Sequence, residues 1–242
     1  MGYQDKYDIW HEQVAGHETH TEDLTHSWHK SVAKLLPYLQ GHVLEIGCGR
    51  GDFSIWLSKT YPAANIVGVD FSEAAIAIAG KRALAAGSRA KFRVEDAQSL
   101  SFENSSFDYV ISCECLEHVP EPLKMAKEIH RVLRSGGHFI LTTENYFNGM
   151  ILMWIKTWIT GTPFNSGSGV QPHENFFLFW KVKKFLEDGG LKVEHMESNN
   201  FQWLMLPRTD PAKLAIQDIT SPVLKRLFRP FGRHFTFSGM RQ

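Results

Sequence analysis

The chain has 242 residues, of which 43% are hydrophobic and 21% are charged, and its 26 basic and 26 acidic residues give a net charge of zero. This composition is sufficient for a buried core and excludes wholesale disorder, and the balanced charge argues against a dedicated nucleic-acid binder. The three cysteines, Cys48, Cys113 and Cys115, are too few for a disulfide scaffold and favour a reducing, cytoplasmic location.

Neither a secretory leader nor a membrane span is predicted. The first residues are polar and acidic, and the most apolar run, 147–160, contains Asn148 and Lys156. That run is also shorter than the ~20 apolar residues that a transmembrane helix needs. We therefore expect residues 1–242 to fold as one soluble domain.

Helical and strand patterns alternate through the first part of the chain. Apolar residues at helical spacing predict a helix over 22–39. Buried-strand patterns follow at 43–46, 66–70, 91–94, 107–112 and 138–143, with helices expected at 52–60, 73–86 and 121–134. Ser72 is the expected cap of the second of these helices, and Gly136-Gly137 is the expected turn into the fifth strand. This alternation predicts a parallel sheet that binds its ligand at the carboxyl ends of its strands.

The regular alternation of strand and helix patterns ends after Thr143. An apolar helix is expected at 146–159, a Gly/Ser/Pro-rich loop at 161–172, a helix at 178–188, and strands at 191–196 and 234–241. Residues 1–40 then form an N-terminal cap and 41–143 a cofactor-binding core. The insertions 144–176 and 204–233 would lie above the carboxyl edge of the sheet as substrate lids.

A glycine-rich turn follows the first strand. Gly47, Gly49 and Gly51 let the backbone approach a ligand closely at the start of a helix. The dinucleotide fingerprint would need a glycine where Asp52 stands, and no Lys-Ser/Thr pair follows to cradle a triphosphate. The turn therefore disfavours nicotinamide and nucleoside triphosphate cofactors.

Acidic residues occur in or just after three successive strands. Glu45 lies inside the first strand, where we expect it to hold the glycine loop and face a positive ligand group. Asp70 follows Gly51 by 19 residues, the spacing at which an acid binds both hydroxyls of a ribose, and Asp96 can accept from an adenine amine. A helix-capping role for Asp70 alone would not explain Glu45 and Asp96. The implied ligand is an adenosine with a cationic amino-acid tail.

Residues 43–143 resemble class I S-adenosylmethionine-dependent methyltransferases, of the small-molecule group that includes the ubiquinone and menaquinone methylases. The matching segments are Val43–Gly51, Val67–Ser72, Glu95–Ala97, Phe107–Val110, Cys115–Val119 and Arg131–Gly137. The resemblance implies a Rossmann-like α/β fold. We expect seven mostly parallel strands with the last antiparallel, helices on both faces and helical lid insertions.

The resemblance also implies a cofactor, S-adenosylmethionine, with S-adenosylhomocysteine as product, and a set of residues that bind it. Beside Glu45, the methionine part would contact Gly47, Cys48 and Gly49, and its amine would face the Cys113 carbonyl and Glu114. The ribose would bind Asp70, and the adenine would contact Phe71, Asp96 and Ala97. Cys48 and Cys113 are also explained as small buried residues, and Phe71 as a core residue.

Methylation of a hydroxyl requires removal of its proton, and two histidines are candidates for this role. His118 follows the fourth strand, as a base, an orienting group or a structural residue; His173 is the second candidate. Glu114, Glu117 and His118 would share one face if their turn were helical, and some relatives hold a metal with this set. Many others carry the same motif without a metal, and we expect no metal here.

The acceptor is expected to be a small molecule. We favour a hydroxyl oxygen of an aromatic, sugar or isoprenoid-type metabolite, with N- or C-methylation, non-catalytic cofactor binding and a dehydrogenase as alternatives. A nucleic-acid acceptor is disfavoured because Cys113-Glu114-Cys115 stands where such enzymes carry Asn/Asp-Pro-Pro. The lids supply large apolar groups, as a substrate chamber or as their own core: Met150, Leu152, Met153, Trp154, Trp158, Phe164, Trp203 and Met205.

The two ends of the chain suggest further contacts. Tyr7, Trp10, His11 and the five-histidine stretch that ends at His29 could fold over the cofactor, and these histidines lack the common helical face that a metal site would need. The basic segment 207–242 either attracts a phosphorylated or membrane-bound substrate or is a solvated face. The sequence is compatible with a monomer or a homodimer.

Overall fold

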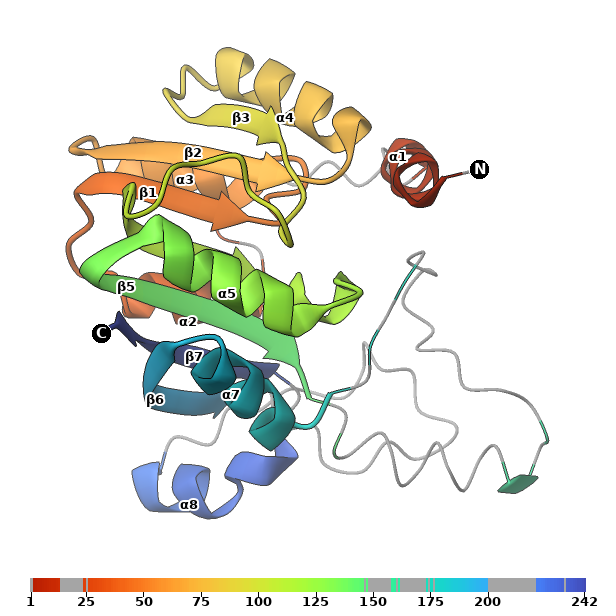
Figure 1. Cartoon of the computed structure of the whole chain (residues 1–242), viewed down its shortest axis with the longest axis vertical. Coiled ribbons are helices and arrows are strands. Elements are labelled where there is room, and N and C mark those ends of the chain that lie inside the picture. Colours follow the sequence, from red (N-terminus) through yellow and green to blue (C-terminus); the bar gives the residue numbers. More distant parts are fainter. Residues whose placement is uncertain are drawn as a thin grey trace.

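A seven-stranded sheet forms the centre of the protein, with strand order β3-β2-β1-β4-β5-β7-β6 (Figure 1). The computed structural model describes residues 2–13, 24, 26–145, 147, 158–159, 161, 173, 175, 177–199, 221–232 and 234–242. The strands are β1 (Gly41–Ile46), β2 (Ala64–Asp70), β3 (Lys91–Val94), β4 (Phe107–Cys113), β5 (Leu133–Glu144), β6 (Leu191–Asn199) and β7 (His234–Arg241).

Strand directions confirm the predicted sheet. Strands β1 to β5 pair in parallel, whereas β7 runs antiparallel to both of its neighbours. The carboxyl ends of the parallel strands therefore lie at one edge of the sheet. Because β7 is antiparallel, its first residue, His234, lies at that same edge, in register with Glu144 at the end of β5.

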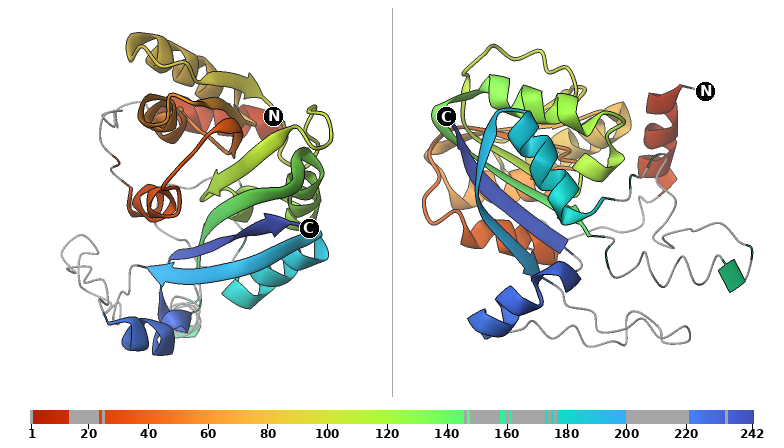
Figure 2. Two further views of the ribbon diagram at one scale, coloured as in Figure 1. Left: turned by 90° about the vertical axis from the view of Figure 1, so that its left-hand side faces the viewer. Right: turned by 60° about the horizontal axis from the view of Figure 1, so that its bottom comes forward.

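Helices cover both faces of the sheet (Figure 2). In β1, Leu44 and Ile46 pack into the core under α5 and α7, whereas Val43 packs into the core under α2 and α3. This alternation is the period-two pattern of a strand buried on both sides. The helices are α1 (Tyr3–Gln13), α2 (Ser27–Lys34), α3 (Asp52–Thr60), α4 (Glu73–Ala85), α5 (Pro122–Val132), α7 (Phe179–Asp188) and α8 (Pro222–Leu227), with short 3₁₀ turns η2 (Leu116–His118) and η4 (Arg229–Phe231).

Local sequence signals explain where two helices begin. The Ser72 hydroxyl caps α4 as predicted, accepting a hydrogen bond from the Ala75 amide at 3.1 Å. Gly51 precedes α3 with a left-handed φ of 81°, and a Cβ there would lie 2.8 Å from the Phe92 ring. A side chain at position 51 would therefore be strained and would clash, so the glycine is required here.

Several element boundaries differ from the predictions. Helix α5 ends at Val132, and β5 begins at Leu133 instead of His138, because Leu133 pairs with Phe107. The predicted turn at Gly136-Gly137 is thus a register irregularity inside β5. Helix α2 spans 27–34, shorter than the predicted 22–39, and β6 continues to Asn199 because β7 pairs with it along that length.

The lid predictions fall mostly outside the described residues. These include most of the expected helix at 146–159, most of the loop 161–172, and residues 200–220. Of the apolar lid residues, Trp158 is described, and it is 82% exposed. The described end of the second insertion forms α8 and η4. In the part of the chain that is described, no helix has the length and apolarity that crossing a bilayer requires.

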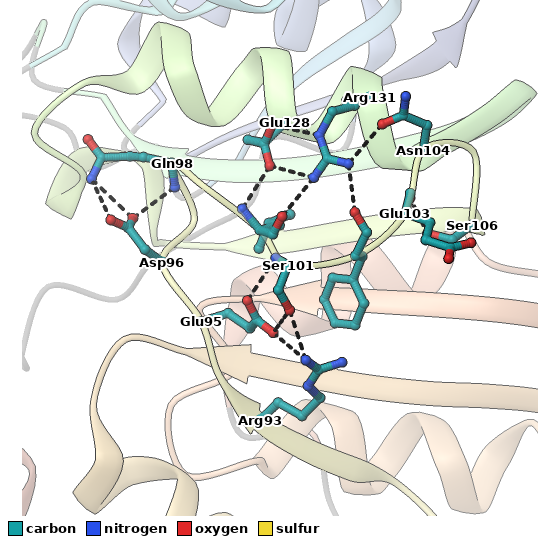
Figure 3. A network of polar contacts seen from close by, with 12 residues as sticks. Arg93, Glu95, Asp96, Gln98, Ser101, Glu103, Asn104, Ser106, Glu128 and Arg131 are labelled. Atoms are coloured by element: carbon teal, nitrogen blue, oxygen red, sulfur yellow. Dashed lines mark hydrogen bonds and ion pairs between the residues drawn. The ribbon is translucent and has the colours of Figure 1, made fainter.

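The loop from β3 to β4, which carries Asp96, is fastened to α5 by hydrogen bonds to Arg131 and Glu128, which form an ion pair on that helix (Figure 3). Arg131 donates to the carbonyls of Leu100 and Phe102 at 2.8 and 2.6 Å. Glu128, paired with Arg131 at 2.7 Å, accepts from the Leu100 amide. Hydrogen bonds from this guanidinium lower the pKa of Glu128, which keeps the carboxylate charged.

We predict that Arg131→Ala destabilises the protein and weakens cofactor binding. The change leaves two loop carbonyls without their donor and Glu128 without its partner, which costs about 1–3 kcal/mol. Thermal unfolding and calorimetric titration with S-adenosylhomocysteine measure the two effects. Lys124→Ala, which removes an exposed ion pair on the same helix, is the control and is expected to change neither. Unchanged values for Arg131→Ala would contradict the anchoring role.

Candidate functional site

A cavity of about 500 Å³ lies at the carboxyl ends of the strands. Its walls contain all ten residues predicted to bind the cofactor, together with His118. They come from the ends of β1, β2 and β4 and from the loop after β3. The structure thus brings together residues that the sequence separates by up to 73 positions.

Asp70 joins the loops that follow β1 and β2. One oxygen of its carboxylate accepts from the Gly49 amide at 2.8 Å, and the other accepts from the Ser72 amide at 3.0 Å. The cap of α4 is Ser72 itself, so Asp70 supports the cap residue through its amide and is not the helix cap. This support does not compete with ribose binding, since each carboxylate oxygen can accept more than one hydrogen bond.

Glu45 is buried behind the glycine loop, with an exposed fraction of 2%. Its carboxyl group accepts a hydrogen bond from the Ser54 hydroxyl on α3. Burial raises the pKa of Glu45 to about 8, so this side chain is mostly protonated at neutral pH. The observed partner of the Glu45 carboxyl group is thus Ser54 on α3. The contact of Glu45 with a positive ligand group stays a prediction.

Asp96 is held at the cavity wall by its own loop. Its Oδ1 accepts from the backbone amide and the side-chain amide of Gln98 at 2.8 and 3.1 Å (Figure 3). The neighbouring Glu95 accepts from the Ser101 amide and pairs with Arg93. These contacts fix the carboxylate at the cavity wall, where Ala97 follows it.

Glu114 adopts a left-handed backbone with φ of 50° at the end of β4. Such a conformation costs a non-glycine residue of order 1 kcal/mol and is concentrated at functional sites. The Glu114 carboxylate lies 3.1 Å from the Nδ1 atom of His234. Ligand atoms of Glu114, Glu144 and His234 lie within 4.8 Å of one another, close enough to hold a cation.

The alternative metal set, Glu114, Glu117 and His118, does not share a helical face. Only residues 116–118 form a 3₁₀ turn, and Glu114 precedes it in the left-handed conformation. Glu117 is 2% exposed and accepts from the Thr143 hydroxyl at 2.8 Å. Burial and the neighbouring Glu114 raise the pKa of Glu117 well above its usual value, which disfavours the charged form that a metal ligand needs.

His118 lines the cavity, and His173 holds it in place. The Nδ1 atom of His118 lies 2.8 Å from the His173 carbonyl oxygen, which can only accept. Nδ1 therefore carries the proton, and the lone pair of the neutral ring is on Nε2. In the described geometry His173 orients the His118 ring through its backbone carbonyl.

Buried thiols are unsuited to nucleophilic chemistry here. Cys48 and Cys113 are each 7% exposed, and burial raises the pKa of both well above the usual value. Both are the small buried residues that the sequence suggested.

Two wall residues, Trp28 and Phe53, were missed by sequence reasoning, whereas the histidine-rich stretch that ends at His29 was expected to fold over the cofactor. His26, Trp28, His29 and Phe53 form an aromatic wall, in which His29 stacks on Phe53 with ring centroids 4.5 Å apart. Burial lowers the pKa of His29 to about 3, so it is neutral. The helical pattern of α2 gave no sign of a site. The antiparallel last strand, however, could have placed His234 at this edge.

Comparison with known proteins agrees with this geometry. Residues 43–137 match the family described as "Methyltransferase domain". Demethylmenaquinone methyltransferase from Staphylococcus aureus is 40% identical over 112 residues, which span 46% of this chain and 46% of the relative. The chain therefore aligns with about half the length of this curated relative.

Solved structures share the whole fold at lower sequence identity. An S-adenosylmethionine-dependent methyltransferase from Thermotoga maritima is 17% identical, with a TM-score of 0.68 over all of both chains. The [4+2]-cyclase SpnF is 20% identical, with a TM-score of 0.67 over 98% of this chain and 94% of its own. These likenesses establish the fold.

We predict that Asp70→Ala abolishes cofactor binding, because it removes a ribose acceptor and the link between two loops. Asp70→Asn keeps one acceptor oxygen and is expected to give an intermediate loss in titrations with S-adenosylhomocysteine. Asp108→Asn is the control: Asp108 pairs with Arg134 and accepts from the His42 amide near the amino end of β1. Tight binding by Asp70→Ala would refute the ribose assignment.

The raised pKa of Glu45 makes a prediction for stability. Between pH 4.5 and about 8 the folded protein binds a proton that the unfolded chain releases, so this group's contribution to stability falls as the pH rises. Glu45→Gln mimics the protonated form. Its melting temperature relative to the wild type should therefore rise steadily from pH 5 to pH 8. A constant difference across that range would mean that Glu45 titrates normally.

Proposed function

We propose that this chain, a class I S-adenosylmethionine-dependent methyltransferase with its methyltransferase domain at residues 43–137, methylates a hydroxyl oxygen of a small molecule. The favoured acceptors are aromatic, sugar or isoprenoid-type metabolites. The observation that carries the proposal is the single cavity in which all ten predicted cofactor residues meet. The residues that line this cavity suit an adenosyl amino acid. They offer carboxylates to the ribose and the adenine, and a glycine loop to the amino-acid tail.

When bound, S-adenosylmethionine supplies an electrophilic methyl group and leaves as neutral S-adenosylhomocysteine. The contribution of the chain is to align the acceptor with that methyl group, and such alignment supplies up to about 7–11 kcal/mol of the barrier. The aromatic wall of His26, Trp28, His29 and Phe53 excludes water and offers ring faces to an apolar acceptor.

The proton of the acceptor hydroxyl requires a base, and we assign His118 to this role. Its Nε2 has the lone pair, since Nδ1 is held by the His173 carbonyl. Tyr7, on α1, lies 3.5 and 3.4 Å from the carbonyls of His118 and His173 and links the two segments. His173 is thus a positioning residue in this proposal, and a base of this kind contributes about 10²–10⁴-fold.

The acidic group at the β4 and β5 ends favours a second candidate. Glu114, Glu144 and His234 lie next to the cavity wall, and the two carboxylates would attract a cationic group. Once an amine acceptor was in its neutral form, it would be N-methylated without a dedicated catalytic base. C-methylation and cofactor binding without catalysis are the remaining alternatives.

The proposal is tested with methyl-labelled cofactor and metabolite extracts, followed by identification of the labelled products by mass. We expect an O-methylated product. We expect His118→Gln to lower kcat about 100-fold or more while the affinity for S-adenosylhomocysteine changes less than twofold. Glu121→Gln, an exposed neighbour, is the control. Labelled amines would favour the second candidate, and cofactor binding without any product would overturn the enzymatic proposal.

A further inference from the structure

Helix α1 is fastened to two of the loops that carry the cofactor residues. Asp8 accepts from the Ser72 hydroxyl at 2.5 Å and from the Ala74 amide at 3.1 Å, at the start of α4. Gln4 donates to the Phe71 carbonyl at 3.1 Å. Arg50, in the glycine loop, donates to the His11 carbonyl at 2.5 Å. Figure 1 shows α1 at the carboxyl edge of the sheet beside α4.

The face of α1 that meets the cavity holds two polar groups without partners. Tyr7, Trp10 and His11 line the cavity, and His11 is only 8% exposed. Trp10 Nε1 and His11 Nδ1 are buried, and among the described residues neither has a hydrogen-bond partner. Burial lowers the pKa of His11, so its ring is neutral. Buried polar groups are nearly always satisfied, so this pair points to a ligand.

The charges along the cavity indicate which part of a ligand belongs there. Six acidic residues line it, and even with Glu45 protonated the cavity repels a carboxylate along most of its length. Of the described lining residues, Arg50 alone carries a permanent positive charge. It meets α1 at His11, and the His11 ring would lie 3.8 Å from a Cβ built on Gly49.

We propose that α1 completes the cofactor site, with Trp10, His11 and Arg50 forming the subsite for the carboxylate of the cofactor's amino-acid tail. The inference rests on the proposed cofactor, whose methionine part is expected along Gly47 and Gly49. Its amine is expected at the other side, near Cys113 and Glu114. The carboxylate is then left with the one corner of the cavity that offers donors and a positive charge.

The test compares two ligands by calorimetric titration. S-adenosylhomocysteine has the amino-acid tail, whereas 5′-methylthioadenosine keeps the adenosine and sulfur but lacks the tail. We expect Trp10→Phe and His11→Phe each to weaken S-adenosylhomocysteine binding about 10-fold, and Arg50→Gln by at least as much. Binding of methylthioadenosine should change less than twofold in all three. Glu12→Gln, exposed on the same helix, is the matched control and should change neither affinity.

The outcomes separate this inference from the cofactor assignment. Equal losses for both ligands would mean that α1 only supports the fold, and unchanged affinities would mean that it does not touch the tail; either overturns the proposal. A wild-type protein that binds neither ligand would instead refute the proposed cofactor. If a variant fails to fold, hydrogen exchange on the wild type decides. Amides of residues 3–13 should be protected by S-adenosylhomocysteine and not by methylthioadenosine.

Discussion

The site depends on the position of one carboxylate, that of Asp70. Parallel strands β1 and β2 end side by side, and their following loops carry amide groups that the sheet itself does not satisfy. Asp70 accepts from one amide in each loop, at Gly49 and Ser72, and so fixes the glycine turn against the start of α4. The Gly47 and Cys48 amides both donate to the Val69 carbonyl, which closes the turn from below. The geometry around a ligand is therefore set before any ligand binds, which lowers the entropic cost of binding.

Burial determines which groups near this turn are charged. Glu45, in the cavity wall, and Glu117 are both buried, and burial raises the pKa of both and so disfavours their charged forms. On the opposite wall burial lowers the pKa of His29 to about 3, and this ring is neutral as well. Since charged groups buried without partners would be costly, neutral forms allow polar side chains to line the cavity floor. The charged groups that can select a ligand are then those at the rim of the cavity and in the loops around it.

Much of the fold and of the candidate site could be predicted because both depend on local sequence. Buried runs, Ser72 as a cap and acids at strand ends are contiguous signals, and they gave the seven-stranded sheet and all ten cavity residues. The start of β5 at Leu133 could not be read locally, since it follows from pairing with Phe107. For the same reason the Glu114–His234 contact, across 120 residues, and the stacking of His29 on Phe53 were missed. Such contacts arise only when distant elements pack together.

What distinguishes this chain from others of its fold must lie outside the shared core. A [4+2]-cyclase has the same fold over almost its whole length, so the sheet and its helices do not by themselves determine the reaction. The region that matches the methyltransferase domain ends at residue 137, before Glu144, His173 and His234, and begins after α1 and α2. Residues outside that region contribute His26, Trp28 and His29 to the aromatic wall, the carbonyl that orients His118, and Glu144 and His234 at the sheet edge. Ligand choice is thus expected to follow from these outer segments, which complete a cavity whose other walls come from the core of the fold.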